Sequence, residues 1–207
     1  MNIAIVGATG NVGRKLIEVL EKKKFPISEL FLVASSKSEG KKISYSGKEY
    51  TVIDLEKFDF SNVKIAFFAA GSLIAEKWAH IAAEKTIVID NSKFFRKDPE
   101  IPLVVPEVNS KELAQVKNKN IIANANCSVI PLVVALKPLH DLYNVKRIVV
   151  STYQSVSGAG KDAMDELASQ TQEFFQNKKL ESKYFTKQIA FNAIPHIDGF
   201  LEDGYTK

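Results

Sequence analysis

The sequence contains a single cysteine, Cys127, in 207 residues. No internal disulfide can form, and such a chain fits a reducing compartment. The sequence also lacks an apolar run long enough to span a membrane, and residues 1–6 show no signal-peptide pattern. Its three histidines and one cysteine form no group with metal-ligand spacing. We therefore expect a cytoplasmic protein that binds no metal and does not enter a membrane.

Arginine is scarce, because the 28 cationic residues include only Arg14, Arg96 and Arg147. The net charge of +4 is modest, and the lysines are scattered along the chain without a dense basic tract. This pattern indicates a solvated surface and argues against nucleic-acid binding. Each arginine is therefore a candidate for recognising a phosphate or carboxylate, which the forked guanidinium group suits better than lysine does.

Strand and helix patterns alternate through the first half of the chain. Strands are expected at residues 2–6, 30–34, 63–69 and 86–90, helices at 14–24 and 74–84, and a hairpin at 42–45 and 49–53. Such alternation is typical of a doubly wound, mainly parallel α/β sheet of the Rossmann type. The expected fold class is therefore α/β, beginning with a Rossmann-like domain.

The rhythm changes in the second half. We expect a loop at 91–109, a short helix at 110–116, a strand at 121–123, helices at 128–136 and 161–175, a strong strand at 145–154 and an irregular tail. A domain boundary near Asn126 is consistent with this change. The expected domains are residues 1–126 and residues 127–207.

Three glycines lie between the first expected strand and the first expected helix, in Gly7-Ala-Thr-Gly-Asn-Val-Gly13. Small residues there let the backbone approach a pyrophosphate, and a helix N-terminus attracts it. Beyond the second strand the chain reads Ser35-Ser-Lys-Ser38. Hydroxyls and a cation at this position suit a 2′-phosphate and favour NADP over NAD, although the following Glu39 does not fit that pattern.

Cys127 follows a strand and a turn and precedes a helix. Free N–H groups and the positive end of the helix dipole favour a thiolate there, so Cys127 is a candidate nucleophile, the alternative being a buried structural cysteine. Arg96 follows a strand end, where open α/β sheets bind ligands; a surface salt bridge to Asp98 or Glu100 is the alternative. Gln154, before a glycine-rich turn, could reach an oxyanion or thioester.

Seven segments, in order along the whole chain, resemble aspartate-semialdehyde dehydrogenases. They are Gly7-Ala-Thr-Gly-Asn-Val-Gly13, Ala34-Ser-Ser-Lys-Ser38, Val88-Ile-Asp-Asn-Ser92 with Phe95-Arg96, Pro102-Leu-Val-Val-Pro-Glu-Val-Asn109, Asn126-Cys-Ser128, Ser151-Thr-Tyr-Gln-Ser-Val-Ser-Gly-Ala-Gly160 and Phe191-Asn-Ala-Ile-Pro-His-Ile-Asp198. Each alone is weak evidence, whereas seven in order are specific.

The resemblance implies reductive dephosphorylation of L-aspartyl 4-phosphate to aspartate 4-semialdehyde by NADPH, in the synthesis of lysine (through diaminopimelate), threonine and methionine. It also implies a homodimer, in which residues 1–126 form the NADP-binding domain and residues 127–207 begin an α+β catalytic and dimerisation domain that is incomplete here. By the resemblance Cys127 forms the thioester, Asn126 positions it, Gln154 orients the acyl group, and Arg96 binds phosphate. The implied cofactor-binding residues are Gly7, Ala8, Thr9, Gly10, Asn11, Val12, Gly13, Ser35, Ser36, Lys37, Ser38, Ser157 and Gly158.

The resemblance also implies that the family's chain continues beyond the part matched here. By that resemblance the general-base histidine and the arginine that grips the substrate carboxylate lie in the further part, so we expect this chain alone to be inactive. Two alternatives stay open. One is a related acyl-phosphate reductase such as N-acetyl-glutamyl-phosphate reductase, and the other is a non-catalytic NADP-binding fragment.

Overall fold

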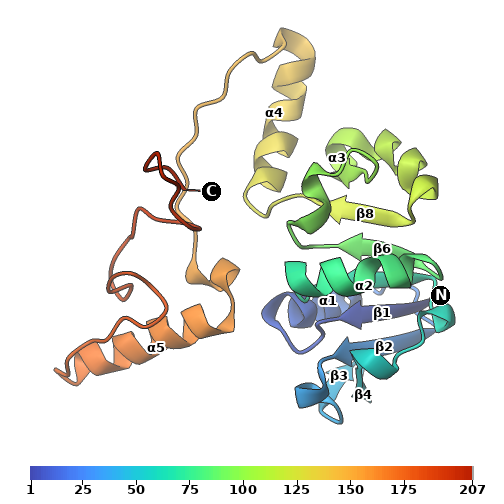
Figure 1. Cartoon of the computed structure of the whole chain (residues 1–207), viewed down its shortest axis with the longest axis horizontal. Coiled ribbons are helices and arrows are strands. Elements are labelled where there is room, and N and C mark those ends of the chain that lie inside the picture. The colour runs from blue at the N-terminus through green and yellow to red at the C-terminus, as the bar shows by residue number, and fades with distance from the viewer. Residues whose placement is uncertain (207) are drawn as a thin grey trace. The chain divides into compact units, whose positions relative to one another are not determined.

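The computed structural model describes residues 1–206, which form two units that divide between Val149 and Val150 (Figure 1). The first unit contains an eight-stranded sheet in the order β3-β4-β2-β1-β5-β6-β8-β7. Every neighbouring pair is parallel except the hairpin of β3 and β4. The strands are β1 Asn2–Val6, β2 Glu29–Ala34, β3 Lys42–Tyr45, β4 Lys48–Asp54, β5 Ile65–Phe68, β6 Ile87–Asp90, β7 Leu103–Val104 and β8 Ile121–Asn124.

Helices and 3-10 helices lie between most of these strands, and α4, η6 and α5 follow the last strand, β8. The α-helices are α1 Asn11–Lys22, α2 Ser72–Ala83, α3 Pro106–Asn109, α4 Val129–Tyr143 and α5 Lys161–Phe175. The 3-10 helices are η1 Ser36–Ser38, η2 Leu55–Lys57, η3 Phe60–Asn62, η4 Phe94–Lys97, η5 Ser110–Asn118 and η6 Val156–Ala159. The predicted α/β class is confirmed.

Alternate residues of β1 pack into two separate cores, one on each face of the sheet. Ile3 and Ile5 pack in the core that contains Ile17 and Leu20 of α1. Ala4 and Val6 belong to the other core, with four buried alanines of α2, which are Ala75, Ala79, Ala82 and Ala83. The alanines place α2 close to the sheet because they have short side chains. A strand that is apolar on both faces is what a sheet covered by helices on both sides requires.

Two expectations about the second half are wrong. The strong strand expected at 145–154 is irregular and mostly exposed, although its residues are β-branched and aromatic. A strand needs a neighbour to take its N–H and C=O groups, and within residues 1–206 no strand pairs with this segment. The loop expected at 91–109 contains β7, whose two residues pair with the end of β8.

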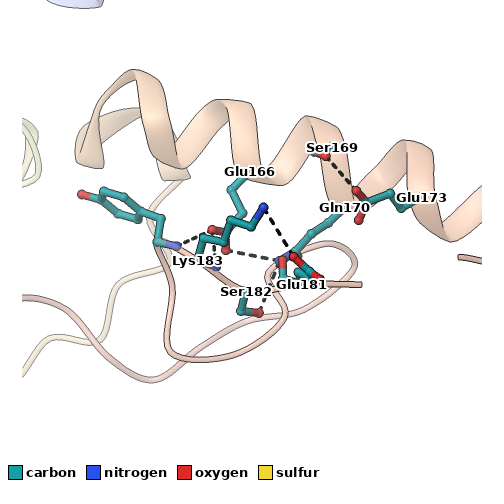
Figure 2. Close-up of polar contacts among 8 residues, drawn as sticks. Glu166, Ser169, Gln170, Glu173, Glu181, Ser182 and Lys183 are labelled. Carbon is teal, nitrogen blue, oxygen red and sulfur yellow. Dashed lines mark hydrogen bonds and ion pairs between the residues drawn. The ribbon is translucent and has the colours of Figure 1, made fainter. Parts of the chain in front are cut away.

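The second unit is built around α5, whose bounds match the predicted helix, and a strap of residues 181–190 that lies along it (Figure 2). The buried Gln170 amide donates to the Glu181 carbonyl and the Ser182 hydroxyl. Its oxygen accepts the N–H groups of Ile189 and Ala190, at 2.9 and 3.1 Å. One buried side chain thus fastens both ends of the strap.

Glu166, one turn earlier on α5, binds the middle of the strap. Its carboxylate accepts the backbone N–H groups of Lys183, Tyr184 and Phe185. Burial raises the pKa of this carboxyl, but the three N–H donors together outweigh it and hold the pKa below the usual 4.5. Because the pKa is lowered on folding, the attachment is complete above about pH 4.5 and weakens as the pH falls through the folded-state pKa.

We expect Gln170→Leu to destabilise the second unit by about 2–5 kcal/mol, because it leaves several buried backbone groups without partners. Hydrogen exchange at Ile189 and Ala190 measures this directly, and both amides should exchange much faster in the variant. Ser169→Ala is the matched control, since the exposed Ser169 lies on the same helix and its hydroxyl donates to the Glu173 carboxylate. Unchanged protection of both amides in Gln170→Leu would contradict the assignment.

Within the described residues, no helix combines the length and the apolar character needed to cross a membrane.

Candidate functional site

The glycine loop joins the carboxyl end of β1 to the N-terminus of α1, near the centre of the sheet. Gly7 has a φ of +87°, and a Cβ added to it would lie 2.6 Å from the Ala69 carbonyl oxygen. A Cβ on Gly13 would lie 2.2 Å from the Gly7 carbonyl oxygen. The Arg14 guanidinium donates to the Thr9 carbonyl at 3.1 Å and ties the helix to the loop. Both glycines are therefore required by backbone packing, and the loop is a cradle of the kind that a pyrophosphate occupies.

The other residues predicted in this loop take different positions. Ala8 is buried and donates its N–H to the Val33 carbonyl, so it fixes the loop to β2. Gly10 precedes α1, and Asn11 and Val12 open it as exposed residues. Exposed groups at a helix N-terminus remain accessible to an anion.

A second glycine turn lies beside the first and was missed by the sequence reasoning. Gly71 has a φ of +85° and precedes α2, and the Ala69 N–H donates to the Val6 carbonyl at 2.8 Å. The signal was present as small residues, Ala69-Ala-Gly-Ser72, between a strand and a helix. Two loops from adjacent strands β1 and β5 therefore meet at the carboxyl edge of the sheet.

The residues after β2 form η1 and approach the glycine loop. Ser35, Ser36 and Lys37 are exposed, whereas Ser38 is buried. The Thr9 hydroxyl donates to the Ser38 hydroxyl at 3.5 Å. The Lys41 ammonium also donates to the Ser38 hydroxyl, at 3.4 Å, and is a second cation here that the sequence reasoning missed. Hydroxyls and cations therefore gather where a Rossmann fold binds the adenosine ribose.

Cys127 is exposed and lies in the turn that enters α4. Its neighbour Asn126 caps that turn. The Asn126 side-chain oxygen accepts the Ser128 N–H at 3.0 Å and the Ser128 hydroxyl at 2.7 Å. The Asn126 carbonyl accepts the N–H groups of Val129 and Ile130, both at 3.0 Å. Exposure removes the alternative of a buried structural cysteine, and the cap holds the Cys127 backbone at the start of the helix.

Arg96, on η4, is held by two backbone carbonyls. Its Nε donates to the Asn124 carbonyl at 2.9 Å and its Nη2 to the Asn91 carbonyl at 3.1 Å. Asn124 ends β8, three residues before Cys127, and Asn91 follows the neighbouring strand β6. The guanidinium and the cysteine therefore belong to the same edge of the sheet.

The surface salt bridge weighed as the alternative for Arg96 is not what the described residues form. Glu100 pairs with Lys119 at 3.1 Å, and the Asp98 carboxylate accepts the Glu100 N–H at 2.9 Å. Arg96 instead donates to the Asn124 and Asn91 carbonyls and so stabilises the turn between β6 and η4.

Asp90 and Ser92 stabilise that turn, and the sequence analysis predicted no role for either residue. The buried Asp90 carboxylate accepts the Ser92 N–H at 3.1 Å and the Ser92 hydroxyl at 2.6 Å. The Ser92 hydroxyl accepts the Phe94 N–H at 3.1 Å. Burial raises the pKa of the Asp90 carboxyl, while these bonds and the charge of Arg96 oppose the rise. The chain of bonds fixes η4 and thereby positions Arg96.

Gln154, Ser157 and Gly158 belong to the second unit. The exposed Gln154 amide donates to the Thr152 hydroxyl at 3.2 Å, and Ser157 shares a hydrogen bond with Ser155 at 2.5 Å. Gly158 lies in η6, before α5. The roles of these three residues remain proposals.

None of the three histidines has a place that assigns it to catalysis. His80 lies on α2 against the edge of Phe95, and His140 lies in the last turn of α4. His196 stacks on Phe200 and bonds the Asp198 carbonyl. In the part of the chain that the structure describes, no three His, Cys, Asp or Glu side chains are grouped to hold a metal ion.

Comparisons with known proteins agree with this arrangement. Residues 2–116 match the family described as semialdehyde dehydrogenase, NAD binding domain, and residues 136–207 match semialdehyde dehydrogenase, dimerisation domain. Aspartate-semialdehyde dehydrogenase of Shewanella violacea is 51% identical over all of this chain and 61% of its own length. The chain therefore spans about three fifths of the length of this relative.

Solved structures give the same result. The crystal structure of aspartate semialdehyde dehydrogenase II of Vibrio cholerae complexed with ASA matches this chain with 54% sequence identity and a TM-score of 0.96. The match covers 100% of this chain and 62% of the Vibrio cholerae chain. Aspartate semialdehyde dehydrogenase of Candida albicans with NADP is 28% identical, with a TM-score of 0.57 over 70% of this chain and 48% of its own.

Proposed function

The chain belongs to the semialdehyde dehydrogenase family, and we propose that it supplies the dinucleotide-binding loops and the nucleophile of an NADP-dependent aspartate-semialdehyde dehydrogenase. The observation that carries this proposal is that Cys127 and Arg96 lie at the same edge of the sheet, where Arg96 donates to the carbonyl of Asn124. An exposed cysteine at a capped turn can attack an acyl group, and a guanidinium held on the Asn124 carbonyl can bind the phosphate.

We propose the following reaction for these residues. The Cys127 thiolate attacks the acyl carbon of L-aspartyl 4-phosphate, phosphate leaves toward Arg96, and an acyl thioester remains on Sγ. A reduced dinucleotide held at the glycine loop would supply the hydride that converts the thioester to the aldehyde and frees the thiolate. We propose that Gln154 orients the acyl group and that Asn126 keeps Cys127 at the helix start, as its two bonds to Ser128 support.

The cofactor residues present fit a dinucleotide. Gly7 and Gly13 leave a backbone cradle that a Cβ would fill, and Thr9 and Ser38 place hydroxyls beside it. We propose that Ser157 and Gly158 also bind the dinucleotide, as the family resemblance implies. The relative from Candida albicans was solved with NADP, which supports the choice of NADP for this chain.

We expect the 207-residue chain to bind NADP more tightly than NAD, because Ser35, Lys37 and Ser38 stand where an acidic residue would favour NAD. Titration of both nucleotides measures the ratio. Replacing Lys37 by alanine should weaken NADP binding and leave NAD binding nearly unchanged, since only NADP carries the 2′-phosphate. Lys48→Ala, at the start of β4, is the control. A preference for NAD in the unaltered chain would contradict the proposal.

Activity is best assayed in an extended chain, in which these 207 residues are followed by the remaining part of the Vibrio cholerae relative. We expect this extended chain to oxidise aspartate semialdehyde with phosphate and NADP. The 207-residue chain alone is expected to show no turnover, because no described histidine is placed to act as the base. Turnover with N-acetyl-glutamate semialdehyde instead would favour the related reductase, and binding without turnover in both chains would favour a non-catalytic module.

The remaining proposals concern the setting of the enzyme. We propose a cytoplasmic homodimer in the synthesis of lysine, threonine, methionine and diaminopimelate. The match of residues 136–207 to a dimerisation domain supports the dimer, as does α4, an apolar helix on which no residue is fully buried. We also keep the boundary at residue 126 as a proposal, since it falls between the two family matches.

A further inference from the structure

Glu39 is the one residue after β2 whose charge opposes a 2′-phosphate. It follows η1 directly, and its N–H donates to the Ser36 carbonyl at 3.2 Å. A carboxylate near the end of this strand is the group that NAD-binding folds use to hold the ribose hydroxyls. Left free, Glu39 would repel the 2′-phosphate of NADP and could accept a hydroxyl of NAD.

Lys57 forms an ion pair with the Glu39 carboxylate. Its ammonium donates to both Glu39 oxygens, at 2.8 and 2.9 Å. Lys57 ends η2, a 3-10 helix that follows β4, and β4 lies beside β2 with Asp54 opposite Ala34. The two strands thus bring residues 39 and 57 together at the edge where η1 approaches the glycine loop. The hydrogen bonds that Lys57 donates to Glu39, and the negative charge of Glu39, raise the pKa of Lys57, so this lysine stays protonated.

A second lysine, Lys41, lies near the Glu39–Lys57 pair, between it and the glycine loop. Lys41 donates to the Ser38 hydroxyl, and Ser38 in turn accepts from Thr9 of the glycine loop. Asp54 is the other carboxylate near Lys57, but its side chain accepts the Glu56 N–H and caps η2. Glu39 is therefore the acidic group that decides whether the field here favours a phosphate.

We propose that Lys57 is a specificity-determining residue, which selects the 2′-phosphorylated dinucleotide by holding the Glu39 carboxylate away from it. This inference rests on the proposed binding of NADP. The pair is exposed, with side-chain exposures of 63% and 40%, so the effect is moderate and falls as salt screens it.

The test is the ratio of the dissociation constants of NAD and NADP for the 207-residue chain and its variants. Lys57→Ala frees Glu39 and should lower the preference for NADP by about two- to fivefold at low salt. Glu39→Gln should keep or raise the preference, and the double variant Lys57→Ala with Glu39→Gln should return close to the unaltered ratio. The loss in Lys57→Ala should shrink in 0.5 M KCl, which is roughly the range in which surface charges are screened.

Lys42→Ala is the matched control, because Lys42 pairs with Glu49 at 2.8 Å on the β3–β4 hairpin with a similar exposure of 62%. It should leave the ratio unchanged. If the unaltered chain prefers NADP but Lys57→Ala does not lower that preference, this inference alone is overturned. The same holds if the double variant does not return to the unaltered ratio. Absence of any NADP preference in the unaltered chain overturns the proposed cofactor together with the inference.

Discussion

Replacing Cys127 by alanine is expected to lower the turnover of the extended chain by roughly 10⁴–10⁶-fold, the range for loss of a covalent nucleophile. No thioester can form without Sγ, and in residues 1–206 there is no other cysteine to take its place. Cys127→Ser should be nearly as inactive, because a hydroxyl at a helix start is a much weaker nucleophile than a thiolate. The measurement is steady-state oxidation of aspartate semialdehyde, with NADP binding measured in parallel.

The control for this substitution is Ser128→Ala. Ser128 donates to the same Asn126 side chain, so the variant alters the cap but leaves the thiol in place. It should lose far less activity than Cys127→Ala. Binding of NADP should be unchanged in all three variants, since the glycine loop is not touched. Turnover of Cys127→Ala within about tenfold of the unaltered protein would show that the nucleophile is elsewhere.

Replacing Arg96 by leucine is expected to lower kcat/KM for phosphate by about 10²–10³-fold, the usual cost of removing one charged donor from a reacting centre. Arg96→Lys should recover little. A single ammonium cannot reach both the Asn91 and the Asn124 carbonyls and still present a donor to phosphate, as the planar guanidinium does. The expected signature is a raised KM for phosphate with an unchanged dissociation constant for NADP.

Arg147→Leu is the matched control, because Arg147 is exposed in the irregular segment before the second unit. It should leave the KM for phosphate unchanged. Equal kcat/KM for phosphate in Arg96→Leu and the unaltered protein would remove Arg96 from the phosphate site, and its two carbonyl bonds would then serve only the turn.

Elements governed by local pattern could be predicted from the sequence. The β1 strand, the β3–β4 hairpin and α5 appear within a residue of the expected bounds, because periodicity, turn residues and caps act over a few positions. The glycine loop and the Cys127 turn were also recognisable, since each is one strand, a turn and a helix in succession. The seven segments that resemble the family could be recognised because each is a short continuous stretch of sequence.

Tertiary structure decided what depends on a partner elsewhere in the chain. Residues 145–154 have a strand's composition and no strand to pair with within residues 1–206, whereas two residues, Leu103 and Val104, become β7 because β8 is beside them. Only folding brings the Asn124 carbonyl to Arg96 and Lys57 to Glu39. Hydrogen bonds and ion pairs between residues 18 or 28 positions apart leave no periodic signal in the sequence. The reactive groups could therefore be identified from the sequence, whereas the charges that act on them depend on the tertiary structure.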